Sequence, residues 1–167
     1  CPCGFDTIKE FNKVTKKYDA VRRCPDRGFE CEKIAVEKIK HFISKEALNI
    51  DGLGKKVVEN FWNLKLIRYP QDIFNLDYDK ISKFDGWGDL SVSNLKYSID
   101  QSKKVSLDRF IYSIGIRHIG IENAKLLAEY TKSITNFLNL IKNKRVNEFL
   151  NIDGIGETQI NSLKKFF

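Results

Sequence analysis

Four cysteines lie within the first 31 residues of the chain, in two pairs: Cys1 with Cys3, and Cys24 with Cys31. Cysteine thiolates are strong zinc ligands, and two close pairs about twenty residues apart are typical of a short β-hairpin between two metal-binding turns. A segment of this size cannot bury a core of its own, so a zinc ion would supply much of its folding free energy. We therefore expect a structural zinc site at these four cysteines, with two disulfides or uncoordinated thiols as the alternatives.

A second pattern lies further along the chain, where an apolar residue, a polar residue, a glycine, an apolar residue and a glycine follow one another four times. The four copies are Ile50-Asp51-Gly52-Leu53-Gly54, Phe84-Asp85-Gly86-Trp87-Gly88, Ile116-Arg117-His118-Ile119-Gly120 and Ile152-Asp153-Gly154-Ile155-Gly156. His118 replaces the first glycine of the third copy, and the closing glycines are 32 to 36 residues apart. Glycine adopts backbone conformations that other residues avoid, and it leaves room for a ligand to approach the main chain.

These glycine turns have the chemistry of a phosphate site. Each turn would open a helix, whose first N–H groups lack partners within the helix and lie at the positive end of its dipole. Such groups bind phosphate and do not distinguish bases, so four copies favour sequence-independent binding to the nucleic-acid backbone. The alternative is that the glycines form only tight turns in a helical array. The candidate DNA-binding residues are Gly52, Gly54, Lys55, Lys56, Gly86, Gly88, Arg117, His118, Gly120, Gly154 and Gly156.

The four turns differ in charge. Two lysines follow the first turn and Arg117 lies in the third, whereas Asp89 and Glu157 follow the second and fourth turns. An acid at the start of a helix suits the helix dipole but repels phosphate. We therefore expect the first and third turns to be the stronger DNA contacts, and the second and fourth to be partly structural.

The elements expected around the turns are helices. Apolar residues recur four and seven positions after each closing glycine, which places them on one helix face. These residues are Val58, Phe61, Val92, Leu95, Ala124, Leu127, Ile160 and Leu163. One helix-hairpin-helix unit cannot cover its own apolar face, so the units should pair. We predict a mainly α chain, with a zinc finger at 1–35 followed by two paired helix-hairpin-helix modules at 36–100 and 101–167. The large aromatic residues of the array should lie in its core.

Composition agrees with a folded, basic protein. Hydrophobic residues make up 42% of the chain, and the formal net charge of +7 favours a polyanionic partner such as nucleic acid. No apolar run approaches the roughly 18 residues of a membrane-spanning helix, and no signal-peptide pattern opens the chain, so we expect no membrane partner. The sequence contains no methionine, which suggests a piece of a longer protein.

Two short motifs resemble motifs of enzymes, but the residues around each of them argue against an enzymatic role. Lys83-Phe84-Asp85-Gly86 has the KxDG pattern of an adenylated lysine, but these residues overlap the second glycine turn. Gly52-Leu53-Gly54 lacks the preceding strand of a dinucleotide site, and Val57 stands where its third glycine should be. We therefore expect no catalytic residue and no small-molecule substrate in this chain.

The order of these parts resembles the C-terminal half of bacterial NAD-dependent DNA ligases. Cys1-Pro2-Cys3-Gly4 resembles the CPxCG opening of that family, with one residue fewer. Ala47-Leu48-Asn49-Ile50-Asp51-Gly52-Leu53-Gly54 resembles its A-h-x-h-x-G-h-G stretch, where h is an apolar residue. The segment from Phe110 to Gly120 is similar to its F-h-x-A-L-G-I-R-x-V-G segment, which also lacks the first glycine. The resemblance covers essentially the whole chain.

This resemblance implies a parent enzyme that seals DNA nicks in replication and repair. The enzyme would transfer AMP from NAD to a lysine and then to the 5′-phosphate, with magnesium, and release AMP on ligation. Its adenylation domain would lie outside these residues, so the fragment alone should be inactive. The finger and the array would hold nicked duplex DNA, as part of a monomer in the bacterial cytoplasm, near the nucleoid.

Two other functions stay open from the residues alone. Tandem hairpins also serve other repair or recombination proteins, although these lack a four-cysteine finger in this order. A zinc-stabilised helical adaptor for protein partners is the other alternative, and it would be indifferent to DNA at low salt.

Overall fold

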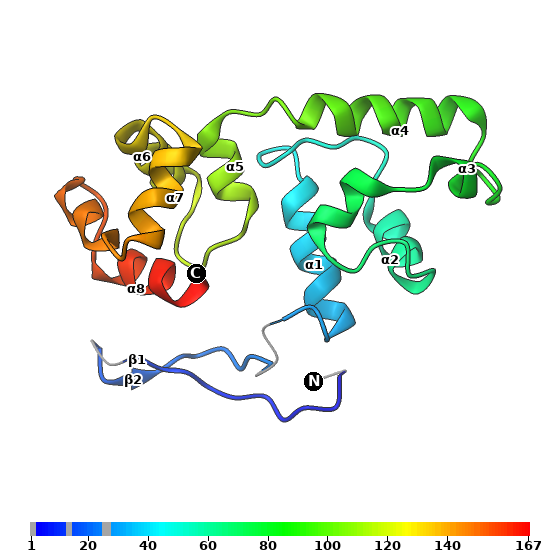
Figure 1. Cartoon of the computed structure of the whole chain (residues 1–167). Helices are drawn as coiled ribbons and strands as arrows, with labels where there is room; N and C mark the ends of the chain where they lie inside the picture. The colour runs from blue at the N-terminus through cyan, green and yellow to red at the C-terminus, as the bar shows by residue number, and fades with distance from the viewer. Residues whose placement is uncertain (1–2, 13–14, 25–27) are drawn as a thin grey trace.

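The computed structural model describes residues 3–12, 15–24 and 28–167. Within these ranges the chain is mainly helical, as predicted, with one small β-hairpin near its start. Figure 1 shows two groups of helices side by side, joined by the segment that follows the long helix α4. The N-terminal segment runs beneath both groups in that view. Among the described helices, none is both long and apolar enough to cross a membrane.

The N-terminal segment contains the predicted hairpin. Strand β1 (Phe11–Asn12) pairs antiparallel with β2 (Lys17–Tyr18), and a further bridge joins Ile8 to Arg23. The rings of Phe11 and Tyr18 lie opposite each other across the strands, with centroids 5.1 Å apart. Successive side chains of a strand point to opposite faces, so the neighbouring pair of residues, Glu10 and Asp19, faces the other way.

The first group of helices surrounds one buried core. It consists of α1 (Glu32–Ile43), α2 (Lys55–Asn63), the 3₁₀ helix η1 (Pro70–Asn75), α3 (Tyr78–Ile81) and α4 (Asp89–Ser102). Its largest fully buried side chains are Ile39, Phe61, Ile67, Ile73, Ile81, Leu95 and Ile99. The core therefore draws on both the first and the second helix-hairpin-helix unit.

The second group has a separate core. It consists of α5 (Leu107–Ser113), α6 (Ile121–Thr131), α7 (Ile134–Lys142), the 3₁₀ helix η2 (Val146–Asn151) and α8 (Glu157–Phe166). Its largest fully buried side chains are Ile111, Leu127, Phe137, Phe149 and Ile160. This core draws on the third and fourth units.

Each unit has a helix before the turn and a helix after it, although the first helix varies. Full α-helices precede the first and third turns, whereas only the four-residue α3 precedes the second and the 3₁₀ helix η2 precedes the fourth. The apolar face predicted from the repeat is confirmed: seven of its eight residues are buried and Val92 is half-buried. Of the large aromatic residues expected in the core, Phe61, Trp62 and Phe137 are buried, whereas Phe74, Trp87 and Phe110 are half-buried.

A small set of polar contacts joins the two groups. The guanidinium of Arg109 on α5 donates from Nε to the carbonyl oxygen of Ala47, at 2.8 Å, and from Nη2 to that of Lys45. His41 Nε2 on α1 lies 2.8 Å from the carbonyl oxygen of Tyr112, and the two rings contact edge to face. These contacts fix α5 against α1 and the turn that follows it.

Candidate nucleic-acid interface and metal centre

All four turns share one backbone feature. Their third residues have a positive φ: +91° at Gly52, +82° at Gly86, +63° at His118 and +93° at Gly154. This left-handed conformation is easily reached by glycine and costs free energy for other residues. The third turn thus keeps the geometry of the others although histidine replaces glycine.

The closing glycine of each turn begins the next helix. Gly54, Gly88, Gly120 and Gly156 are the N-cap residues of α2, α4, α6 and α8, respectively. A Cβ atom built on any of the first three would have no other group within 4 Å, so the space beside the main chain is open. This arrangement gives a phosphate access to the N–H groups of the first helical turn.

The fourth turn differs because its own chain occupies it. The side-chain oxygen Oε1 of Gln159 accepts a hydrogen bond from the backbone N–H of Gly156, at 3.1 Å. A Cβ atom on Gly156 would lie 3.6 Å from the same oxygen. A ligand at this turn would therefore have to displace the Gln159 side chain.

The turns are braced by the partner unit within each group. Gly52 packs against Leu95 of α4, 3.5 Å from the position of its Cβ, and Gly154 packs against Leu126 of α6 at 3.2 Å. The backbone N–H of Asp51 donates to the Ser98 hydroxyl at 2.7 Å. The first and second turns also line one hollow, formed by Asp51, Gly52, Val57, Gly86, Trp87, Ser91, Asn94 and Leu95. Pairing of the units thus sets the distance between their turns.

The basic residues of the first turn are open to solvent. Lys55 and Lys56 are both exposed at the start of α2, and Lys55 has one neighbouring acid, Glu59, at 3.9 Å. Their position at a helix N-terminus places positive charge beside the N–H groups. The first turn therefore combines an open main chain with two available cations.

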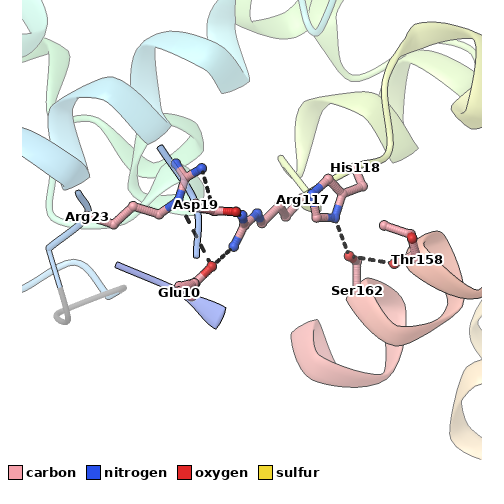
Figure 2. A network of polar contacts seen from close by, with 7 residues as sticks. All are labelled: Glu10, Asp19, Arg23, Arg117, His118, Thr158 and Ser162. Atoms are coloured by element: carbon pink, nitrogen blue, oxygen red, sulfur yellow. Dashed lines mark hydrogen bonds and ion pairs between the residues drawn. The ribbon is translucent and has the colours of Figure 1, made fainter. Parts of the chain in front are cut away.

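The arginine of the third turn is already paired (Figure 2). Arg117 forms ion pairs with Glu10 and, at 3.1 Å, with Asp19, both on the N-terminal hairpin. The hydrogen bond to Glu10 is the main reason that the pKa of Arg117 is raised, and Asp19 raises it further. Arg117 therefore stays positively charged. The structure thus brings the predicted DNA residue Arg117 to the finger.

His118 points in the other direction and contributes no cation near neutral pH. Its Nδ1 lies 3.0 Å from the hydroxyl oxygen of Ser162 on α8. Burial lowers the pKa of His118 below its usual 6.5, and the positive charges of Arg117 and Arg23 lower it further. The histidine therefore acts as a neutral hydrogen-bonding group that joins the third turn to the last helix.

Three of the four predicted metal ligands lie together. The sulfur atoms of Cys3, Cys24 and Cys31 are all within 4.8 Å of one another, and those of Cys3 and Cys24 are 3.3 Å apart. This separation exceeds a disulfide bond of about 2.05 Å and is near the edge of about 3.8 Å in a tetrahedral zinc–thiolate site. A hydrogen bond from the backbone of Phe5 lowers the pKa of Cys3, which favours the thiolate. The donor set fits zinc; Cys1 lies outside the described residues.

The residues that brace the third turn could not be found by the sequence analysis. Glu10, Asp19 and Arg23 lie about a hundred residues before Arg117, and Ser162 lies 44 residues after His118. No sequence pattern indicated Arg109, which joins the two groups of helices, either. None of them belongs to a repeated motif, so no local signal pointed to them.

Comparison with known proteins gives consistent matches. The family described as "Helix-hairpin-helix motif" matches residues 109–167, the third and fourth units. The whole chain is 64% identical to part of a DNA ligase of Pelagibacter ubique, 46% to one of Wolbachia pipientis and 39% to one of Parvibaculum lavamentivorans. In each case it covers 25% of the relative, so the chain spans about a quarter of the length of these proteins.

Proposed function

Because the chain is homologous along its whole length to a segment of the DNA ligases, we propose that it is the duplex-binding segment of such an enzyme. It would grip the sugar-phosphate backbone without sequence preference and hold nicked DNA during replication and repair. Adenylation by NAD, magnesium-assisted sealing and AMP release would take place in other parts of the parent protein, in the bacterial cytoplasm near the nucleoid. The segment alone would be monomeric and inactive.

One observation carries this proposal. Each of the four turns has a left-handed third residue and a closing glycine that begins a helix. At three of these glycines the space beside the main chain is open. Phosphate is the DNA group that such backbone N–H groups recognise, and every nucleotide carries one. Repetition of the geometry, rather than any single turn, therefore supports a backbone grip.

The first turn would be the strongest contact. It combines the open Gly54 with the exposed ammonium groups of Lys55 and Lys56. Asp89 follows the second turn and Gln159 fills the fourth, which supports a more structural role for these two. The third turn has an open Gly120, but Arg117 is bound to the finger.

We also propose the division into a zinc finger at 1–35 and two helical modules at 36–100 and 101–167. The two separate buried cores support the modules. Cys1, Cys3, Cys24 and Cys31 would hold zinc, which would tie the ends of the β-hairpin together. Because Cys31 is the N-cap of α1, the ion would also anchor the finger to the first module.

Binding measurements across a salt series test the proposed function. The zinc-loaded chain is titrated with nicked, intact and single-stranded DNA of several sequences. For about six phosphate contacts, the logarithm of the affinity should fall with the logarithm of the salt concentration with a slope of roughly −5. Equal affinity across duplex sequences supports the backbone grip. If the chain alone does not bind duplex at low salt, the same titration of a full-length ligase decides between two explanations. Duplex affinity that is unchanged by Lys55→Ala there would favour the protein adaptor, whereas a loss of affinity would show that the grip needs the other domains.

A further inference from the structure

The finger and the third turn are joined by a network of four charged side chains: Glu10, Asp19, Arg23 and Arg117 (Figure 2). Arg117 contacts both acids, and Arg23 contacts the same two acids, at 3.2 Å for Asp19 and 4.0 Å for Glu10. Two positive and two negative charges alternate, so the network has no net charge. We call it the finger–turn network.

In the third turn, the finger supplies the acidic side chains that the other three turns have in their own sequence. The second residue of the turn is an aspartate in the first, second and fourth copies (Asp51, Asp85 and Asp153), and it is Arg117 in the third copy. The third turn alone among the four thus has a cation at this position, three residues before the open N-cap Gly120. Docking of the finger neutralises that cation with two carboxylates.

A DNA phosphate would compete with these carboxylates for Arg117. The guanidinium prefers planar two-oxygen acceptors, and carboxylate and phosphate both offer them. We propose that the finger–turn network is a latch: DNA displaces Glu10 and Asp19 from Arg117, and the third turn becomes a full phosphate contact only after this exchange. The inference rests on the proposed backbone-binding function.

The geometry makes the exchange inexpensive. The side chains of Arg117 and Arg23 are each 43% exposed, and those of Glu10 and Asp19 are 18% and 26% exposed. Ion pairs that are open to solvent on the arginine side contribute little stability. When Arg117 leaves, Arg23 still faces both acids, so neither carboxylate is left without a positive partner. The turn itself keeps its shape, because His118 is held separately by Ser162.

A charge-neutralising double variant tests the latch. In the zinc-loaded chain, Glu10→Gln with Asp19→Asn should tighten binding to intact duplex by about two- to fivefold, the worth of exposed ion pairs. The salt slope should steepen by about 1, for one further phosphate contact. Both changes should vanish when Arg117→Gln is added.

A matched control separates the latch from a general loss of negative charge. Glu37→Gln with Asp100→Asn removes the same charge from exposed pairs with Lys40 and Lys103, away from the turns. The latch is wrong if the control tightens binding as much, if the gain persists with Arg117→Gln, or if the test variant weakens binding. In the last case Arg117 is a clamp that positions the finger. Failure of the unmodified chain to bind duplex at all, together with a full-length ligase whose duplex affinity is unchanged by Lys55→Ala, would overturn the proposed function and the latch with it.

NMR of the side chains gives a second readout that does not depend on a variant folding well. The network joins the finger to the third turn, whereas the bridge between Ile8 and Arg23 and the bond from the Asp19 N–H to the Glu10 carbonyl oxygen lie within the finger. Addition of duplex to the unmodified chain should therefore shift the side-chain carboxyl resonances of Glu10 and Asp19, because both lose Arg117. Unchanged carboxyl resonances during binding would contradict the latch.

Discussion

The Nδ1 atom of His118 lies 3.0 Å from the hydroxyl oxygen of Ser162, and this contact joins the third turn to the helix of the fourth unit. The Ser162 hydroxyl in turn donates to the carbonyl oxygen of Thr158 at 2.9 Å. Because its single proton is used there, the hydroxyl accepts from His118, which places the imidazole proton on Nδ1. The contact therefore braces the left-handed third turn from the side of the last helix.

The first prediction concerns pH. The pKa of His118 is below its unfolded value of 6.5 because of burial and the two nearby arginines. The unfolded chain therefore binds a proton at a higher pH than the folded chain. The stability contributed by His118 should be complete above about pH 6.5, where it does not change with pH, and should be lost as the pH drops below that value. Urea unfolding between pH 5.5 and 8, at fixed zinc, should show this fall. His118→Asn, which tolerates a positive φ, should flatten the profile; an unchanged profile would contradict the assignment.

The second prediction compares two turn glycines for stability. Gly86→Ala and Gly154→Ala both place a side chain at positive φ, which costs about 1 kcal/mol. At Gly86 the added methyl group meets open space, whereas at Gly154 it lies 3.2 Å from Leu126. Gly154→Ala should therefore cost more, by a further 0.5 kcal/mol or so. Denaturant unfolding measures both, and equal costs would show that Leu126 does not brace the fourth turn.

The third prediction separates stability from binding. Gly54 has an ordinary φ of −64° and open space around its Cβ position, so Gly54→Ala should cost only about 0.5 kcal/mol of stability. The methyl group would nevertheless stand where a phosphate approaches the N-terminus of α2, so duplex affinity should fall about fivefold or more. Gly156→Ala is the matched control, because Gln159 already occupies that turn. A larger effect from the control would reverse the proposed ranking of the turns.

The fourth prediction concerns the lysines of the first turn. Lys55→Ala and Lys56→Ala should each weaken duplex binding to all sequences alike and reduce the magnitude of the salt slope by about 1. Lys40→Ala and Lys103→Ala remove the same charge from exposed ion pairs elsewhere and serve as controls. Fluorescence anisotropy across a salt series measures the slopes. A change confined to one DNA sequence would argue against a backbone contact.

The fifth prediction concerns metal removal. Chelation should release a single zinc ion and unfold the β-hairpin, because none of the described side chains in residues 3–24 is buried. The helical signal at 222 nm should persist, since the two helical cores do not depend on the cysteines for most of their buried residues. Cys24→Ser should mimic chelation. A collapse of the helical signal would show that zinc also holds the first module together through Cys31.

Repetition explains what the sequence predicted well. Four aligned copies average out local ambiguity, so the turns, the closing glycines and the buried positions such as Leu95 and Leu127 could be predicted. The repeat predicted a helix before the fourth turn, but not that it would be the 3₁₀ helix η2. The additional helix α7 was not predicted, because it lies between copies where no repeat constrains the chain. The binding residues that were proposed stay predictions.

The contacts of Arg117 join parts of the chain that no sequence motif connects. A motif records which residues are close along the chain, whereas Glu10 and Arg117 meet only after the finger has folded back over the second group of helices. Charge pairs of this kind depend on the relative placement of distant elements. The sequence indicated a basic residue at the turn, and the structure adds what already holds it.

The junction made by Arg109 and His41 has a consequence for affinity. Two modules joined by a loose tether would each have to find the duplex, and every encounter would cost orientational freedom. With α5 fixed against α1, binding of one module presents the other to the same duplex at a high effective concentration, and the entropy of alignment is lost during folding instead of during binding. Under the proposed function, individually weak phosphate contacts on the two groups of helices would thereby act as one multivalent grip, with a spacing set by the fold.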